Sequence, residues 1–319
     1  MKLEHHDVQE IGKWVENARR ILIIPHKNPD GDAIGSALGL YRVFSDMGKE
    51  AEVACYDVPP TPFNFIPDIE KVKVGLPELT HDIIFIVDSG ATHLTGFNES
   101  HPRLFDKSLP TVNIDHHPTN ENYGRLNLVA PTAASTTSIL YRLVFQLDWP
   151  LSREAATCFL TGIYTDTGSF MHSNTDSLTL QIAARLVARG ADLRSISKEL
   201  FNTTKISTLQ LWGRVLKNTY QTGEGVTVSV VTEKDFEDTG ADYSEMTGVV
   251  DYVNSVPDSA YSVILSERAG KVKGSLRTLR DEINVSDIAS QWGGGGHAKA
   301  AGFTVPGKLE REIRWKVVE

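Results

Sequence analysis

The stretch RILIIPHKNPDGDAIGSALGLYRVFSDMG (20–48) predicts a strand, an acidic loop and a helix in succession. Its first part, 20–26, is short and largely apolar, which is typical of a buried strand. Residues 33–48 carry apolar side chains at helical spacing, and Gly48 marks the end of that helix. A strand followed by a helix is the repeating unit of α/β folds, and the loop between them lies at the carboxyl end of the strand.

Further apolar segments, rich in β-branched residues, predict three more strands at 50–56, 82–88 and 111–115. Helical spacing of apolar residues follows at 134–147, 152–166 and 176–190. Short strands that alternate with helices favour an α/β fold, with a doubly wound, mostly parallel sheet covered on both faces.

The pattern changes after about residue 220. Strand-like segments with turn residues between them occur at 226–231, 261–277 and 301–305, around one helix near 244–254. We therefore expect a smaller C-terminal α+β domain with a mixed sheet. The predicted organisation is a metal-binding catalytic domain (1–190), a helical linker (191–219) and a substrate-binding domain (220–319).

The net charge of −9 argues against a protein that works on long nucleic acid. Such proteins usually present a broad basic surface, because counterion release supplies their affinity. We expect short or small phosphate-bearing substrates and no long duplex. Only two cysteines are present, Cys55 and Cys158, far apart in sequence. This excludes a disulfide scaffold or a cysteine-based zinc site and suits the cytoplasm. No segment approaches the ~18 apolar residues of a membrane span, and the N-terminus lacks signal-peptide features.

Carboxylates and imidazoles follow the end of an apolar element at four places along the chain. They are His26, Asp30 and Asp32 after the first strand, Asp88 after the third, Asp115, His116 and His117 after the fourth, and Asp166 at the end of a helix. Because ligands bind at the carboxyl ends of strands in open parallel sheets, these loops are expected to converge.

The donor set contains nitrogen and oxygen ligands and no thiolate, which suits Mn²⁺ or a similar ion better than structural zinc. Two aspartates separated by one residue, Asp30 and Asp32, can each face a different ion. Two divalent ions bridged by a carboxylate stabilise a phosphoryl group during hydrolysis.

Each motif also has a simpler interpretation when taken alone. NPDGD is typical of a turn, Asp88-Ser-Gly of a turn after a strand, and Asp166-Thr-Gly of a helix end capped by Gly168. The occurrence of four such motifs, each at the expected end of an element, favours the metal site.

The motifs HKNPDGDAIGS, VDSG, IDHHPTN and TDTGSF resemble those of the DHH phosphoesterase family. GSLRT (274–278) and GGGGHAKAAGF (293–303) resemble its DHH-associated C-terminal domain. The resemblance extends from about residue 10 to 305. Length and domain order are similar to the branch of nanoRNases and 3'-phosphoadenosine 5'-phosphate (pAp) phosphatases.

This resemblance implies a role for each acidic or imidazole side chain. One ion would be bound by His26, Asp30 and Asp88, and the other by Asp32, Asp88, His116 and Asp166, so that Asp88 bridges the two. His117 would face the substrate phosphate as an acid or charge stabiliser, and Asp115 would orient the histidine pair. The fourth motif departs from the family, because Ser169-Phe170-Met171-His172 lacks its usual basic residue. The departure concerns a peripheral substrate contact.

Positive charge is concentrated in the C-terminal domain, where residues 261–304 contain six Lys or Arg against four acidic residues. We expect Arg277 to bind phosphate through its guanidinium fork. Glycines let the backbone approach an anion closely, although a glycine run alone is more typical of a flexible loop. The predicted substrate-binding residues are Ser275, Arg277, Gly294, Gly295, Gly296 and His297.

The sequence thus predicts a two-metal-dependent phosphohydrolase that acts on short oligoribonucleotides (a nanoRNase) and on pAp, with a homodimer as one option for its oligomeric state. A cyclic di-AMP or pApA phosphodiesterase is the alternative, followed by a pyrophosphatase or exopolyphosphatase. A nucleotide-binding module without catalysis is disfavoured, because positions 32, 88 and 166 all carry Asp. A dinucleotide-dependent oxidoreductase is rejected, since NPDGDAIGS is not the GxGxxG motif.

Overall fold

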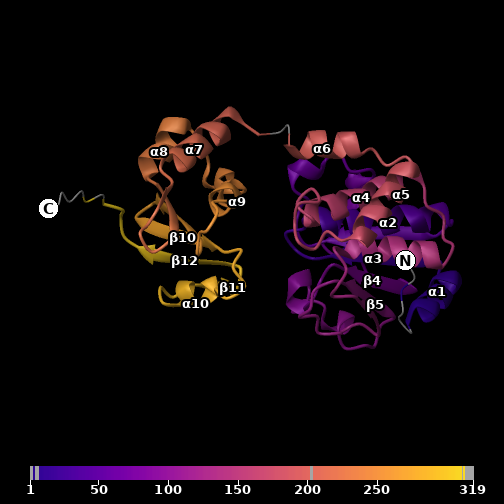
Figure 1. Cartoon of the computed structure of the whole chain (residues 1–319). Helices are drawn as coiled ribbons and strands as arrows, with labels where there is room; N and C mark the ends of the chain where they lie inside the picture. The colour runs from indigo at the N-terminus through magenta and orange to yellow at the C-terminus, as the bar shows by residue number, and fades with distance from the viewer. Residues whose placement is uncertain (1–2, 4–6, 202–203, 311, 313–319) are drawn as a thin grey trace, which may run out of the picture. The chain divides into compact units, whose positions relative to one another are not determined.

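The computed structural model describes residues 3, 7–201, 204–310 and 312 (Figure 1). The chain divides into two compact units, residues 1–203 and 204–319. Among the described residues, no helix has both the length and the apolar character needed to cross a membrane.

The first unit alternates strands and helices, which confirms the predicted α/β class. Its strands are β1 (Arg20–Pro25), β2 (Glu50–Cys55), β3 (Val72–Val74), β4 (Ile83–Val87), β5 (Thr111–Asp115) and β6 (Leu126–Val129). Its helices are α1 (Asp7–Asn17), α2 (Gly31–Asp46), α3 (Thr136–Gln146), α4 (Arg153–Asp166), α5 (Ser177–Ala188) and α6 (Leu193–Phe201). The short strands β3 and β6 were not predicted, because three or four residues show too little periodicity.

The sheet of the first unit has the strand order β3-β2-β1-β4-β5-β6, and all its pairs are parallel. The chain direction across the sheet reverses between β1 and β4, and such a switch point is where open α/β sheets bind ligands. Pro25 of β1 pairs with Val87 of β4, so His26 and Asp88 leave the sheet side by side. Val87 pairs in turn with Ile114 of β5.

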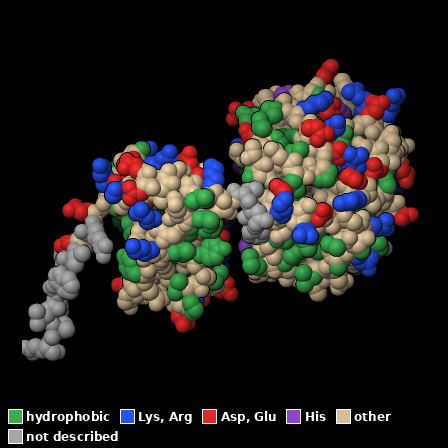
Figure 2. All heavy atoms as spheres, turned by 90° about the horizontal axis from the view of Figure 1, so that it is seen from above, with side chains coloured by type: hydrophobic (Ala, Val, Ile, Leu, Met, Phe, Trp, Pro, Cys, Tyr) green, Lys and Arg blue, Asp and Glu red, His purple; other side chains and the backbone are tan. Residues whose placement is uncertain are grey.

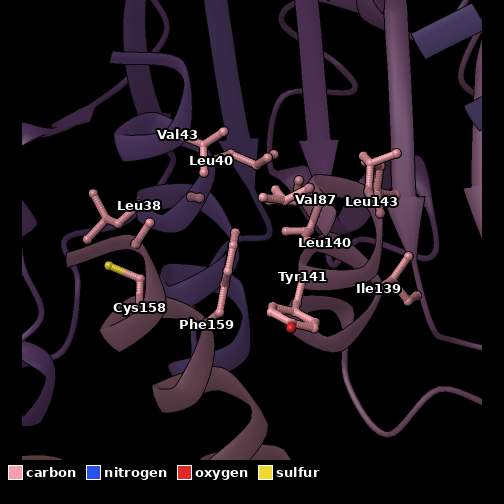
Figure 3. Packing of buried hydrophobic residues seen from close by; sticks show 14 of the residues in the cluster. Leu38, Leu40, Val43, Val87, Ile139, Leu140, Tyr141, Leu143, Cys158 and Phe159 are labelled. Carbon is pink, nitrogen blue, oxygen red and sulfur yellow. The ribbon is translucent and has the colours of Figure 1, made fainter. Parts of the chain in front are cut away.

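Alternate side chains of β1 point to opposite faces of the sheet and pack in two different hydrophobic cores. Ile21 and Ile23 pack in the core that includes helices α2 to α5, whereas Leu22 and Ile24 pack on the other face. That second face is covered by loops and by the short 3-10 segment η4 (Pro102–Leu104), which contributes Leu104. Figure 3 shows side chains of the first core. They come from α2 (Leu38, Leu40, Val43), β4 (Val87), α3 (Ile139, Leu140, Tyr141, Leu143) and α4 (Cys158, Phe159).

Helices α2 and α4 approach each other closely along a stripe of glycines on α2. Gly31, Gly35 and Gly39 are four residues apart and therefore lie on one side of the helix. A Cβ atom added to Gly35 would lie 2.5 Å from the carbonyl oxygen of Cys158, and one at Gly39 would lie 2.2 Å from the ring of Phe159. Only glycine fits at these contacts.

A fourth glycine, Gly162, faces back from α4. A Cβ atom there would lie 2.6 Å from Oδ1 of Asp32 and 2.4 Å from Cγ2 of Thr137. This contact joins the start of α2, the start of α3 and the last turn of α4. It brings Asp166, the last residue of α4, to the loop that follows β1.

The second unit is an α+β domain with a mixed sheet, as predicted. Its strand order is β11-β12-β10-β9-β8-β7, in which only β8 and β9 are parallel. The strands are β7 (Tyr220–Gln221), β8 (Thr227–Val231), β9 (Ser262–Arg268), β10 (Lys271–Arg277), β11 (Gly295–His297) and β12 (Ala300–Pro306). The helices are α7 (Ile206–Lys217), α8 (Glu233–Thr239), α9 (Val249–Asn254) and α10 (Val285–Ser290).

The close helix contact generates a stability prediction. We expect Gly35→Ala to lower the free energy of unfolding by about 1–3 kcal/mol, since the new methyl group meets the backbone of α4. Chemical denaturation followed by circular dichroism measures this change. Gly213→Ala is the matched control, because Gly213 lies exposed in α7 with nothing near its Cβ position. That variant should be at least as stable as the parent chain. Equal stability of the two variants would contradict the account.

Candidate metal centre and active site

His26 follows β1 directly and is fixed by its own backbone. Its Nδ1 lies 2.7 Å from the carbonyl oxygen of Lys27, which assigns the ring proton to Nδ1 and turns Nε2 toward the acids. Nε2 lies 3.7 Å from Oδ1 of Asp30 and 3.6 Å from Oδ2 of Asp88. Burial lowers the pKa of His26, but hydrogen bonds with both aspartates outweigh it and raise the pKa to about 11.

Asp30 is the N-cap of α2. Its Oδ1 accepts hydrogen bonds from the backbone N–H groups of Asp32 and Ala33, both at 3.0 Å. The loop is therefore a capped helix start, and the same carboxylate also faces His26. The turn-like and the metal-binding interpretations of NPDGD thus describe one structure.

Asp32 is held at the N-terminus of α3. Its Oδ2 accepts from the backbone N–H of Thr136 at 2.6 Å, and its Oδ1 accepts from the N–H and hydroxyl of Thr137 at 3.0 and 2.6 Å. A helix N-terminus favours a negative charge. Burial and the charges of Asp88 and Asp166 nevertheless raise the pKa of Asp32 well above its usual value.

Asp88 directly follows β4 and has a strained backbone conformation. Its φ is 54°, in the left-handed region that is uncommon for a residue with a side chain and often marks functional sites. The side chain is 3% exposed, and its Oδ1 accepts a hydrogen bond of 2.8 Å from the hydroxyl of Thr136. Thr136 thereby contacts both Asp88 and Asp32.

His116 and Asp166 form the other side of the site. Nδ1 of His116 lies 3.3 Å from the carbonyl oxygen of Ala133, and its Nε2 lies 3.5 Å from Oδ2 of Asp166 and 3.8 Å from Oδ1 of Asp88. Burial raises the pKa of Asp166, His116 opposes the shift, and the carboxylates of Asp88 and Asp30 add to it, so that the pKa reaches about 6.

The structure brings all six predicted metal ligands together. Within the described part of the chain, three groups have ligand atoms that all lie within 4.8 Å of one another, namely His26 with Asp30 and Asp88, Asp32 with His116 and Asp166, and Asp88 with His116 and His117. Asp88 belongs to two of these groups. Burial, together with repulsion from neighbouring carboxylates, raises the pKa values of Asp32 and Asp166, and a divalent cation would relieve that repulsion. The residues therefore fit two divalent ions.

His117 lies at the edge of this cluster, with its Nδ1 3.9 Å from Oδ1 of Asp88, and it is oriented by Asp115. Its Nδ1 lies 2.7 Å from Oδ1 of Asp115, and its side chain is 44% exposed, whereas that of Asp115 is fully buried. The hydrogen bond to Asp115 raises the pKa of His117. Burial raises the pKa of Asp115, but its bonds to His117 and Asn120 outweigh this and lower it.

Sequence analysis missed three residues that hold these side chains. Thr136 and Thr137 position Asp32, and Asn120 donates to Asp115 at 2.7 Å. The run AASTTS at the start of the predicted helix was a usable signal, because hydroxyl residues there suit a helix N-terminus that receives a carboxylate. Asn120 lies in the IDHHPTN motif but has no signature of its own.

In the second unit, the sheet register aligns the predicted substrate-binding residues. Arg277 and His297 both pair with Ala300, so they lie in one row across β10, β12 and β11. The next row on the same face contains Ser275, Gly302 and Gly295. Four of the predicted residues, Ser275, Arg277, Gly295 and His297, therefore share one face at one end of the sheet, whereas Gly296 pairs with Ala301 and Gly294 precedes β11.

The glycine run is not the loose loop that its composition alone suggests. Gly295 and Gly296 belong to β11, which pairs with β12. A Cβ atom at Gly294 would lie 2.2 Å from the carbonyl oxygen of Gly302, and one at Gly296 would lie 2.6 Å from that of Ala300. Close strand packing thus requires these glycines, while their contact with substrate stays a prediction.

Comparison with known proteins identifies the family. Residues 20–163 match the DHH family, N-terminal domain, and residues 223–317 match the DHHA1 domain. A bifunctional oligoribonuclease and PAP phosphatase NrnA of Thermus thermophilus is 36% identical over 305 residues, which cover 94% of this chain and 88% of that protein. The chain belongs to the DHH family.

Other DHH relatives are more distant. The Bacillus subtilis protein with the same name is 26% identical, with 89% of each chain covered. A cyclic-di-AMP phosphodiesterase PdeA of Listeria monocytogenes is 25% identical over 92% of this chain, but the match spans 46% of that protein. The crystal structure of an exopolyphosphatase-related protein from Bacteroides fragilis superposes with a TM-score of 0.83 at 26% identity, covering 96% of this chain and 92% of that chain.

The position of Thr136 between Asp32 and Asp88 gives a prediction for this DHH site. Thr136→Val removes the hydroxyl donor to Asp88, and we expect Mn²⁺ affinity to fall about 10–100-fold, as for other residues that orient ligands. Thr136→Ser should stay close to the parent chain. Isothermal titration calorimetry measures both.

Thr157→Val is the control, because Thr157 is also buried but its hydroxyl donates to the carbonyl oxygen of Arg153. An unchanged affinity in Thr136→Val, or an equal loss in Thr157→Val, would refute the role of Thr136.

Proposed function

We propose that this chain is a two-metal-dependent phosphohydrolase that cleaves short oligoribonucleotides and pAp. The observation that carries the proposal is the meeting of four carboxylates and two imidazoles at the switch point of the sheet, with Asp88 shared between two groups. The substrate class is supported by the relatives named as oligoribonucleases and PAP phosphatases, which the chain matches over almost its full length.

Mn²⁺ is the proposed metal, because the ligand atoms are imidazole nitrogens and carboxylate oxygens without sulfur. The proposed ligands are His26, Asp30 and Asp88 for one ion, and Asp32, Asp88, His116 and Asp166 for the other. When bound, such ions lower the pKa of water and stabilise negative charge on phosphoryl oxygens.

The protein's own residues supply the proton for the leaving group. Asp115 holds Nδ1 of His117, so the ring presents Nε2 to the solvent-exposed side. A water oxygen forms a bond to phosphorus while the bond from phosphorus to the leaving oxygen breaks. His117 donates its Nε2 proton to that oxygen, and it regains a proton from solvent, which takes up the one released by the attacking water.

The second unit is proposed to contribute to substrate binding through Ser275, Arg277, Gly294, Gly295, Gly296 and His297, of which Ser275, Arg277, Gly295 and His297 share one face of its sheet. A local site of this kind agrees with short substrates. On the face seen in Figure 2, Lys and Arg side chains are interspersed with Asp and Glu on both units, and long nucleic acid usually requires a broad basic surface.

A cyclic di-AMP or pApA phosphodiesterase is the second candidate. The Listeria relative named as a cyclic-di-AMP phosphodiesterase favours it, although the match covers less than half of that protein. The structure of the exopolyphosphatase-related protein gives weaker support for a polyphosphate substrate.

We also propose that the protein acts in the cytoplasm and forms a homodimer. Cys55 and Cys158 are both free and buried, which suits a reducing compartment. Phe145 of α3 and Leu180 and Val187 of α5 are exposed apolar side chains on neighbouring helices, and such surfaces often contact a second copy.

A substrate panel tests the proposed function. With Mn²⁺ present, we expect hydrolysis of pAp and of RNA two to five residues long, at a higher kcat/KM than hydrolysis of cyclic di-AMP, pApA or pyrophosphate. Chelation should abolish the activity, and added Mn²⁺ should restore it. Product analysis by chromatography measures each rate. No turnover of any compound, or turnover unaffected by chelation, would refute the proposal.

A further inference from the structure

A buried polar side chain lies inside the central sheet beside the active site. Asn113 is in the middle of β5 and is fully buried. Its amide nitrogen lies 3.2 Å from the carbonyl oxygens of Ile86 and Ser89 and 3.1 Å from the hydroxyl of Tyr123. An amide among buried apolar residues is costly unless it is hydrogen-bonded, and here both the nitrogen and the oxygen of the Asn113 amide have partners.

Tyr123 forms one end of the hydrogen-bond network that contains Asn113. Its side chain is 5% exposed, and its hydroxyl donates to the carbonyl oxygen of Ser89 at 2.8 Å. Ser89 immediately follows Asp88, so the backbone that carries Asp88 accepts bonds from both Tyr123 and Asn113. The network is therefore anchored in the sheet core at the base of the site.

Asn120 connects that anchor to the catalytic histidine. Its amide nitrogen lies 2.9 Å from Oδ1 of Asn113 and 2.7 Å from Oδ2 of Asp115. The other carboxylate oxygen of Asp115, Oδ1, is hydrogen-bonded to Nδ1 of His117 at 2.7 Å. A continuous chain of hydrogen bonds thus runs from Tyr123 through two asparagines and one aspartate to the exposed imidazole.

We propose that Asn120, anchored by Asn113, is a positioning residue for proton donation by His117. This inference rests on the proposed function. With both oxygens of Asp115 engaged, the carboxylate has one orientation, and His117 presents Nε2 in one direction. Without Asn120, Asp115 keeps a single side-chain partner and rotates, so His117 no longer points consistently at the leaving oxygen.

The close packing at Gly90 agrees with a fixed geometry. A Cβ atom there would lie 3.3 Å from Oδ2 of Asp115 and 3.2 Å from Cβ of His117. Asn120 itself is in a loop and is half-buried. Its truncation removes no apolar side chain from the sheet core but leaves Oδ1 of Asn113 without this donor, so circular dichroism checks that the variant folds.

The test measures the activity of the Asn120→Ala variant on two substrates that differ in their leaving group. One is a diadenosine dinucleotide, whose leaving alkoxide needs a proton, and the other is a p-nitrophenyl ester of adenosine monophosphate, whose aryl oxide does not. We expect kcat for the dinucleotide to fall about 10–100-fold, within the ~10²–10⁴-fold contribution of a positioned acid. KM, bound Mn²⁺ and turnover of the aryl ester should stay within a factor of about three.

Asn127→Ala is the matched control, since Asn127 is also half-buried and exchanges hydrogen bonds with the backbone of Gly124. This variant should leave the turnover of both substrates unchanged. Asn120→Gln, which keeps the amide, should recover part of the lost kcat. An equal fall on both substrates, or no fall on the dinucleotide, would overturn the positioning role. Failure of the unmodified protein to cleave either substrate would instead refute the proposed function.

Discussion

The close approach of α2 and α4 is the constraint on which the site depends. Gly31, Gly35 and Gly39 remove side chains from one side of α2, and Gly162 does the same on α4. Apolar packing in the shared core then holds the helices at a separation that no larger residue permits. The consequence is chemical as well as structural, because the last residue of α4 is Asp166, and this approach carries it to the loop after β1.

Around that contact, backbone strain and helix ends fix the acidic groups. Asp30 caps α2, Asp32 accepts from the first residues of α3, and Asp88 adopts a left-handed conformation at the end of β4. Thr136 ties Asp32 to Asp88 through its N–H and its hydroxyl. Crowded carboxylates are unfavourable without positive charge. Holding these carboxylates close together therefore lowers the stability of the fold locally, and it provides a set of ligands that suits divalent ions.

Much of the fold followed from the sequence, because long apolar strands and helices have clear periodicity. The strands at 20–26 and 82–88 were predicted within two residues at each end. Short elements such as β3 were not predicted, because they contain too few residues to show a periodic pattern. In the site, side chains directly after strands were identifiable, whereas Thr136 and Asn120 act through contacts between segments distant in sequence. No local pattern encodes such contacts.

The stoichiometry of Mn²⁺ binding tests most directly whether Asp88 bridges two ions. If Asp88 bridges two ions, the unmodified protein binds two ions per chain and Asp88→Asn, which keeps the side-chain shape but loses the charge, binds at most one. Asp148→Asn is the matched control, because Asp148 also has a left-handed φ, of 53°, yet belongs to none of the three ligand groups. It should bind two ions. Two ions bound tightly by Asp88→Asn, or one ion in the unmodified protein, would contradict the account.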